Sequence, residues 1–320
     1  MKLRLSNVIA PRAVSAAILL LLALVPLFAY AADQPYYVRL FARILIFSLA
    51  ALSLTLTLSY GGMISFGHAL YLGIGAYSVG LFTYYSVNSG WAHLAGALAC
   101  AGFVAASTGA ICLRTSGLGF LMITFAFGQM FYFLMVSLKS YGGDEGLPID
   151  SRSDFGPWLS FDNIVVLYYV TFVLLLAVLC VFDRLINSEF GLILRGCRSN
   201  ERRVKALGLS PFRYKLSAYV ISAIVCSLAG MLLANLTKFA SPEYMSWIRS
   251  GDLIVMVILG GMNSLMGAVV GAIVLLLFEE TLSSWTQHWM AILGPFIVLM
   301  TLLARQGLYG SLVVARPGTK

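Results

Sequence analysis

Residues 163–182 read NIVVLYYVTFVLLLAVLCVF, a run of twenty residues without one charged side chain. A helix needs about 20 mostly apolar residues to cross the hydrocarbon core of a bilayer. The run is continuously apolar, whereas a strand of a membrane barrel alternates apolar and polar residues. This stretch therefore predicts a transmembrane α-helix.

Eight further apolar runs surround this one, at 13–32, 40–59, 67–85, 92–112, 117–138, 216–236, 252–278 and 288–304. The chain of 320 residues is 60% hydrophobic and 11% charged, whereas an average globular chain carries about a quarter charged residues. We expect an all-α polytopic membrane protein with about 8–10 transmembrane helices, one or two of them broken or re-entrant. Residues 1–320 form a single membrane domain, and 13–32 is interpreted as a retained first helix rather than a cleaved signal.

The basic residues indicate how the chain is oriented. The net charge is +8, and cytoplasmic loops of membrane proteins collect Lys and Arg. A cytoplasmic N-terminus puts 15 of the 21 basic residues inside, and the six on the outer side are Arg39, Arg43, Lys139, Arg152, Lys238 and Arg249. The C-terminus is also inside if the run 252–278 turns back once, at 260–263. The distribution of basic residues therefore predicts how the chain is oriented in the membrane. We expect no nucleic-acid partner.

The segment 183–215 is the main cytoplasmic loop in this topology. Its centre, RGCRSNERRVKALG at 195–208, has five basic residues among fourteen. Ser188-Glu189 before an apolar-periodic stretch is a helix start signal, and Gly208 followed by Pro211 is a stop signal. We expect a short amphipathic helical unit, which either lies on lipid headgroups or docks into the groove of a partner.

Two glycine-rich places interrupt the apolar runs. They supply the candidate residues for a solute path: Gly61, Gly62, Met63, Ser65, Gly67, His68, Gly260 and Gly261. Such glycines most often allow close helix packing. The alternative is a broken helix whose exposed backbone groups line a cavity, as in transporters. The stretch 60–68 favours the broken helix because it combines a glycine pair with a serine and a histidine.

An outer loop is predicted at 140–149, SYGGDEGLPI. Gly142, Gly143, Asp144 and Gly146 provide turn chemistry, since glycine adopts positive φ at no steric cost. The loop is either simply solvated, or structured so that it closes an entrance or meets an external partner.

The spans carry few groups for catalysis or energy coupling. The five cysteines are scattered and the three histidines lack metal-ligand spacing, so no metal site is expected. The sequence has no P-loop, and the middles of the runs lack the ionisable residues that a proton relay needs. We expect a transporter rather than an enzyme, with a neutral path and an external energy source.

Several motifs resemble the permeases of ABC transporters, most closely the LivM-type permeases for branched-chain amino acids. They are EFGLILR at 189–195 with RSNE at 198–201, ALGLSPFRYK at 206–215, YGGMISFGHA at 60–69, TFAF at 124–127, GGDEGL at 142–147 and LGGMN at 259–263. The resemblance covers about residues 45–310, in the family order. Two residues, Met63 and Tyr141, depart from the family pattern.

The resemblance implies an importer of the bacterial inner membrane. A LivM-like and a LivH-like permease pair over two ATP-binding subunits and receive solute from a periplasmic binding protein. ATP binds the partner subunits, and this chain binds no cofactor. The coupling residues would be Glu189, Gly191, Arg195, Arg198, Asn200, Glu201 and Gly208. The solute would be a branched-chain amino acid, another amino acid, urea or an amide. The alternative function is a self-sufficient facilitator or channel for a small neutral or zwitterionic solute such as urea.

Overall fold

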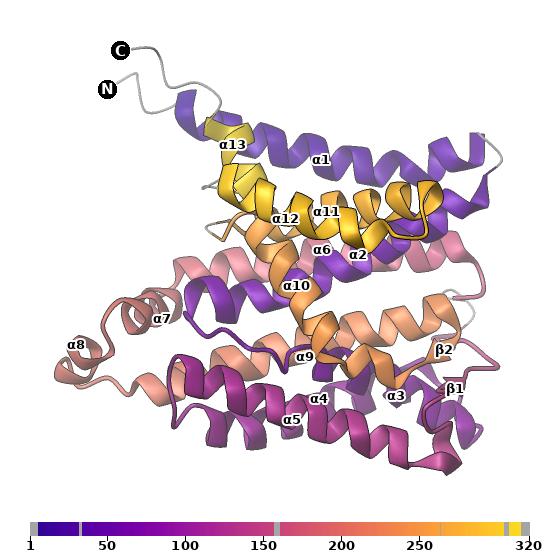
Figure 1. Cartoon of the computed structure of the whole chain (residues 1–320), viewed down its shortest axis with the longest axis horizontal. Coiled ribbons are helices and arrows are strands. Elements are labelled where there is room, and N and C mark those ends of the chain that lie inside the picture. The colour runs from indigo at the N-terminus through magenta and orange to yellow at the C-terminus, as the bar shows by residue number, and fades with distance from the viewer. Residues whose placement is uncertain (1–5, 32–33, 157–160, 263, 304–306, 315–320) are drawn as a thin grey trace.

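The structure, a computed structural model, is a bundle of long helices that run side by side (Figure 1). It describes residues 6–31, 34–156, 161–262, 264–303 and 307–314. The helices before the charged loop are α1 (Ser6–Ala31), α2 (Pro35–Thr55), α3 (Ala69–Tyr84), α4 (Gly90–Cys112), α5 (Leu118–Ser137) and α6 (Ile164–Asn187). The later ones are α7 (Glu189–Ser199), α8 (Glu201–Ala206), α9 (Pro211–Thr237), α10 (Trp247–Gly260), α11 (Leu265–Trp285), α12 (Trp289–Leu303) and α13 (Gly307–Val314). The all-α polytopic prediction is confirmed.

Six helices of the described residues are long and apolar enough to cross a membrane. They are Pro35–Tyr60, Gly90–Cys112, Leu118–Ser137, Ile164–Asn187, Pro211–Thr237 and Leu265–Trp285. Three shorter apolar helices, Ala13–Ala29, Ala69–Tyr84 and Trp289–Met300, accompany them. The predicted number of about 8–10 spans is reached only if these shorter helices also cross the bilayer.

The helix boundaries follow local signals in the sequence. Pro35 and Pro211 stand in the first turns of α2 and α9, where a missing N–H costs nothing. Asn163 caps α6 by accepting from the Val165 N–H at 2.9 Å. Ser264 caps α11 in the same way, with the Gly267 N–H at 2.9 Å.

Both predicted interruptions of the apolar runs are present. Helix α2 continues as a π-helical turn, η1 (Leu56–Tyr60), and residues 61–68 then form an irregular segment before α3. The run 252–278 is divided into α10 and α11, and α10 is followed by Gly261, whose φ of +118° favours glycine. Asn263, the fourth residue of that predicted break, lies outside the described residues.

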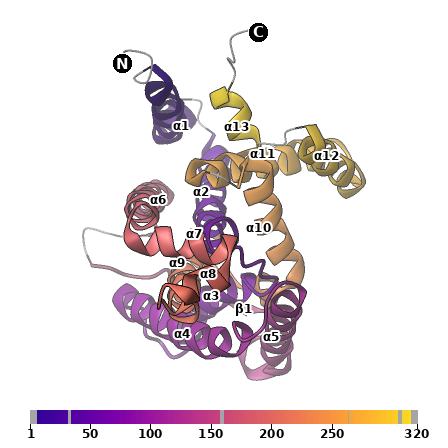
Figure 2. The ribbon, with the colours of Figure 1, turned by 90° about the vertical axis from the view of Figure 1, so that its left-hand side faces the viewer.

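Helices α2 and α9 form the centre of the bundle. Helix α9 packs against α2, α3 and α4, while α2 also packs against α6, α10 and α11. Helix α10 crosses its neighbours obliquely (Figure 1). Seen end-on, α1, α12 and α13 lie on the side of the bundle opposite α4 and α5 (Figure 2).

The bundle has two distinct ends. Helices α7 and α8 project from one end, which also carries α13 and the beginning of α1 (Figure 1). The other end carries two short 3₁₀ turns, η2 (Lys139–Tyr141) and η3 (Pro242–Met245), and the strands β1 (Leu147–Pro148) and β2 (Phe239–Ala240). The strands pair antiparallel, with Leu147 opposite Ala240. The loop 183–215 and the described ends of the chain thus share one side, as the charge-based topology requires.

Candidate functional site

Two short helices, α7 and α8, form the charged loop between α6 and α9. Ser188 is the extended residue before α7, and its hydroxyl donates to a carbonyl of the last turn of α6 at 2.6 Å. Asn200 separates the helices and caps α8, because its side-chain oxygen accepts the Arg203 N–H at 3.1 Å. Gly208, with φ +81°, precedes the start of α9 at Pro211. The predicted helical unit and its start and stop signals are confirmed.

Several of the predicted coupling residues hold α7 against α6. Arg195 donates from Nη2 to the Ile186 carbonyl at 2.9 Å and from Nε to the Gly191 carbonyl at 3.3 Å. A Cβ on Gly191 would lie 2.2 Å from the Ile186 oxygen, so only glycine permits this approach. Glu189 stands in the first turn of α7, where its charge complements the helix dipole. These contacts hold the start of α7 close against the end of α6.

An ion pair joins α8 to α9. Lys215 Nζ lies 2.6 Å from one oxygen of Glu201, and Lys205 Nζ lies 3.5 Å from the other. The hydrogen bond from Lys215 lowers the pKa of Glu201. The pair therefore stabilises the fold at neutral pH, and this contribution is lost as the pH falls below the ordinary glutamate pKa of about 4.3.

Arg198, near the end of α7, is exposed, and its side chain reaches the end of α2. Its Nη1 donates to the Ser59 carbonyl in η1, at the end of α2. Its side-chain carbons also lie against Gly62. Helix α7 thus contacts the irregular segment 61–68 directly.

The segment 61–68 holds most of the candidate path residues. Gly61, Met63, Ser65 and Gly67 are buried, whereas Gly62 and Ile64 are exposed. A small cavity of about 90 Å³ lies beside its first residues, and Thr115 and Lys215 also line it. The segment is mostly covered by protein, as non-helical backbone in a membrane must be.

His68 anchors the inner end of this segment. It is fully buried, and its Nε2 lies 3.0 Å from Ser53 Oγ on α2 and 3.3 Å from Ser222 Oγ on α9. The next residue, Ala69, donates its N–H to Ser250 Oγ on α10 at 3.0 Å. His68 therefore joins α2 and α9, Ala69 adds α10, and the buried imidazole does not face an open path.

Gly260 and Gly261 pack against other helices rather than lining a cavity. A Cβ on Gly260 would lie 1.7 Å from the Gly267 oxygen of α11. A Cβ on Gly307 of α13 would lie 2.2 Å from the Gly261 Cα. These glycines permit the close crossing of α10, α11 and α13, which agrees with the packing interpretation.

The outer loop is structured. Gly142, Gly143 and Gly146 all have positive φ, of +91°, +51° and +85°. The chain then enters the β1–β2 pair, which ties the loop to the end of α9. Asp144 is exposed at the tip of the loop. The loop is thus ordered, while its role in closing an entrance or meeting an external partner stays a prediction.

Replacing Gly142 by Ala should disrupt this loop. The new Cβ would lie 2.2 Å from the Gly146 oxygen, and the alanine would have to adopt φ +91°. We therefore expect the free energy of unfolding to fall by about 1–3 kcal/mol. Gly143→Asn is the matched control, because asparagine tolerates the left-handed region and the nearest atom lies 3.4 Å away. Thermal unfolding in mild detergent measures the difference, and equal midpoints for the two variants would contradict this assignment.

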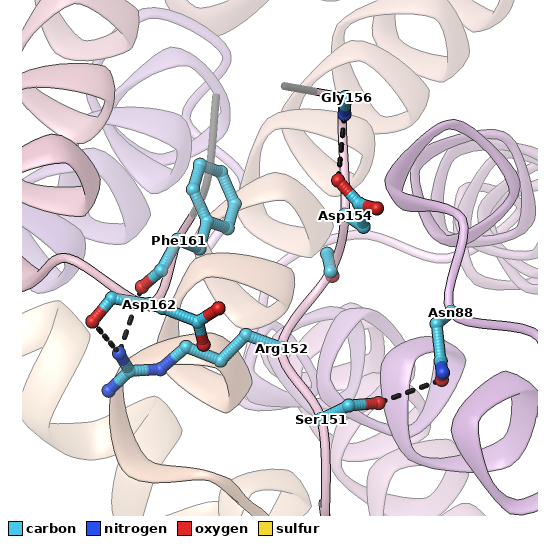
Figure 3. A pocket seen from close by; sticks show the side chains of 8 residues that line it. Asn88, Ser151, Arg152, Asp154, Gly156, Phe161 and Asp162 are labelled. Atoms are coloured by element: carbon cyan, nitrogen blue, oxygen red, sulfur yellow. Dashed lines mark hydrogen bonds between the residues drawn. The ribbon is translucent and has the colours of Figure 1, made fainter. Parts of the chain in front are cut away.

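A polar cavity of about 570 Å³ is lined by residues that include Asn88, Arg152 and Asp162 (Figure 3). Its lining residues 151–154 follow shortly after β1, so the cavity lies at the same end of the bundle as the outer loop. Arg152 spans its wall, donating to the carbonyls of Asn235 at 2.9 Å, Phe161 at 2.8 Å and Asp162 at 2.9 Å. Burial lowers the pKa of the Arg152 guanidinium. Sequence reasoning treated Arg152 only as an outside charge, and no motif marked its structural role. Within the described residues, no three His, Cys, Asp or Glu side chains gather as a metal site.

With this geometry in place, the sequence comparisons identify the family. The family described as "branched-chain amino acid transport system / permease component" matches residues 36–304. That range runs from the second residue of α2 through α12 and includes the whole α7–α8 loop. The chain belongs to this permease family.

Characterised members of the permease family are similar along most of the chain. The LivM permease of the high-affinity branched-chain amino acid transport system of Escherichia coli K12 is 29% identical over 303 residues, covering 86% of this chain and 70% of LivM. The LivH permease of the same organism is 24% identical over 285 residues, covering 82% of this chain and 91% of LivH. No solved structure matches this chain.

Sequence reasoning missed two leucines in the α7–α8 loop of this permease. Leu192 and Leu207 are 66% and 73% exposed, although large apolar side chains normally avoid water. Both were included in the predicted amphipathic unit, but its burial pattern could not be assigned without the position of α6 and α9. They now mark the outward surface of the loop.

Proposed function

We propose that this chain is a permease subunit of an ATP-driven importer for branched-chain or related amino acids. The observation that carries the proposal is the α7–α8 loop. It packs against α6, α9 and the turn η1 at the end of α2, and it leaves Leu192 and Leu207 exposed. Relatives that are permeases of branched-chain amino acid transport systems support the solute class. The role is transport rather than catalysis.

The position of the loop supports a protein partner rather than lipid headgroups. In the end-on view, α7 and α8 lie in front of the ends of α2, α3 and α9, with other helices around them (Figure 2). The inner face of α7 therefore rests on protein, and its outer face is turned away from the bundle. An apolar surface in that place suits the groove of a partner subunit.

The proposed partners are two ATP-binding subunits, which hold the ATP, together with a LivH-like permease and a periplasmic solute-binding protein. The basic α7–α8 end would face the cytoplasm, as the positive-inside rule favours. In this proposal both termini lie in the cytoplasm, and the protein lies in the bacterial inner membrane. The outer loop and the Arg152 cavity would then face the periplasm, where the binding protein delivers solute.

Purification of the tagged chain from native membranes in mild detergent tests this function. We expect two ATPases and a second permease to co-purify, and mass spectrometry identifies them. The purified assembly in proteoliposomes should take up leucine, isoleucine or valine only with ATP and binding protein, and unlabelled urea should not compete. Transport by this chain alone, driven by a solute gradient, would contradict the proposal and favour a facilitator.

A further inference from the structure

The contact between α7 and the end of α2 involves two parts of one side chain. The Arg198 guanidinium donates to the carbonyl of Ser59 in the π-helical turn. Carbonyls in the last turn of a helix lack partners within the helix, so a cation is a favourable donor there. The stem of Arg198 lies against Gly62, the second residue after the turn.

Gly62 is adapted to this contact. Its φ of +66° favours glycine, and an added Cβ would lie 2.8 Å from Arg198 Cγ and 3.4 Å from Arg198 Cβ. Arg198 therefore touches the chain on both sides of the point where helix α2 ends. A movement of α7 cannot leave residues 59–62 in place unless this contact breaks.

The irregular segment 61–68, which we call the strap, carries this contact into the bundle. At the inner end of the strap, a Cβ on Gly67 would lie 2.3 Å from the Thr124 oxygen of α5. His68 is held by Ser53 and Ser222. The strap thus joins α7 at one end to α2, α5 and α9 at the other.

We propose that Arg198 is a positioning residue that transmits movement of α7 to the strap, and that it is not a contact residue for the ATPases. This inference rests on the proposed function. It assigns different roles within one loop, since Leu192 and Leu207 form the surface that a partner meets. Arg198 instead converts displacement of the loop into displacement of the strap and of the helices that hold its inner end.

The test uses the complete transporter in proteoliposomes, with wild-type chain, Arg198→Ala, Arg198→Lys and Arg184→Ala. Arg184 is the matched control, because it is exposed on the last turn of α6 and carries the same charge. For Arg198→Ala we expect unchanged amounts of bound ATPase and a drop of about fivefold in leucine taken up per ATP hydrolysed. Arg198→Lys should restore part of the ratio, and Arg184→Ala should keep it.

Loss of the ATPases from the Arg198→Ala complex would overturn the inference and make Arg198 a docking residue. A wild-type ratio of uptake to hydrolysis would overturn it as well. If the wild-type complex shows no ATP-dependent uptake, the proposed function itself is overturned. This result is distinct from the two outcomes for Arg198→Ala.

A second measurement on the purified full chain needs no partner. Hydrogen exchange of the strap amides should rise about tenfold in Arg198→Ala, as expected for the loss of one hydrogen bond to a charged group. The same amides should exchange at the wild-type rate in Arg184→Ala. Unchanged exchange in Arg198→Ala would overturn the role of the arginine, and a general rise over all helices would assign it to folding instead.

Discussion

Replacing Leu192 and Leu207 together by Asp should remove the ATPases from the purified complex. These side chains are the large exposed apolar residues of the α7–α8 loop. Burial of a leucine in a partner groove contributes about 1.5–3 kcal/mol, so loss of two weakens binding by about 100-fold or more. A carboxylate forced into an apolar groove adds a desolvation cost.

The double Met variant, Leu192→Met with Leu207→Met, is the matched control, since it keeps apolar volume at both sites. Quantitative mass spectrometry of tagged complexes measures the ratio of ATPase to this chain. That ratio should stay at the wild-type value in the Met variant and fall close to zero in the Asp variant. An Asp variant that retains its ATPases would show that the partner binds elsewhere.

Replacing Gly230 by Ala should prevent the chain from reaching its native packing. Helix α9 crosses α3 so closely that a Cβ on Gly230 would lie 1.8 Å from the Leu72 oxygen. Gly75 makes the reciprocal contact, 1.9 Å from the Ser227 oxygen. Both obstacles are backbone atoms, which cannot rotate away. We therefore expect Gly230→Ala to lower the free energy of unfolding by about 3 kcal/mol or more.

Gly102→Ala is the control for this substitution. Gly102 lies within α4, where the nearest atom to its Cβ position is 3.7 Å away, an ordinary contact. Alanine favours the helix there by about 1 kcal/mol, so the control should be neutral or slightly more stable. Size-exclusion elution and thermal unfolding in mild detergent compare the variants. A Gly230→Ala chain that elutes and unfolds like the wild type would refute the close α3–α9 crossing.

The order of helices could be predicted from hydropathy because each span is continuously apolar. The two interruptions were also predictable, since glycine pairs with polar residues stood between apolar runs. The start of α7 at Glu189 and of α9 at Pro211 followed from local capping signals. These features depend on residues close together in the chain, which is why the sequence alone was sufficient.

The partners of the loop residues could not be predicted in the same way. Arg198 and Ser59 are separated by 139 positions, and nothing in either sequence neighbourhood indicates the other. The pairing of Leu147 with Ala240 is similarly distant. Arg198 is exposed, as its charge favours. Only the tertiary arrangement shows that the carbonyl of Ser59, at a helix end, accepts its hydrogen bond.

The strap and α3 have a consequence for how the protein enters the membrane during synthesis. The sixteen residues of α3 span about 24 Å at 1.5 Å per residue, less than the thickness of the hydrocarbon core. The preceding backbone is irregular and cannot face lipid. Its cover includes Ser222 of α9, which the ribosome makes more than 150 residues after His68. The strap and α3 must therefore be sheltered from lipid, in the insertion machinery or against α2, until α9 has been made.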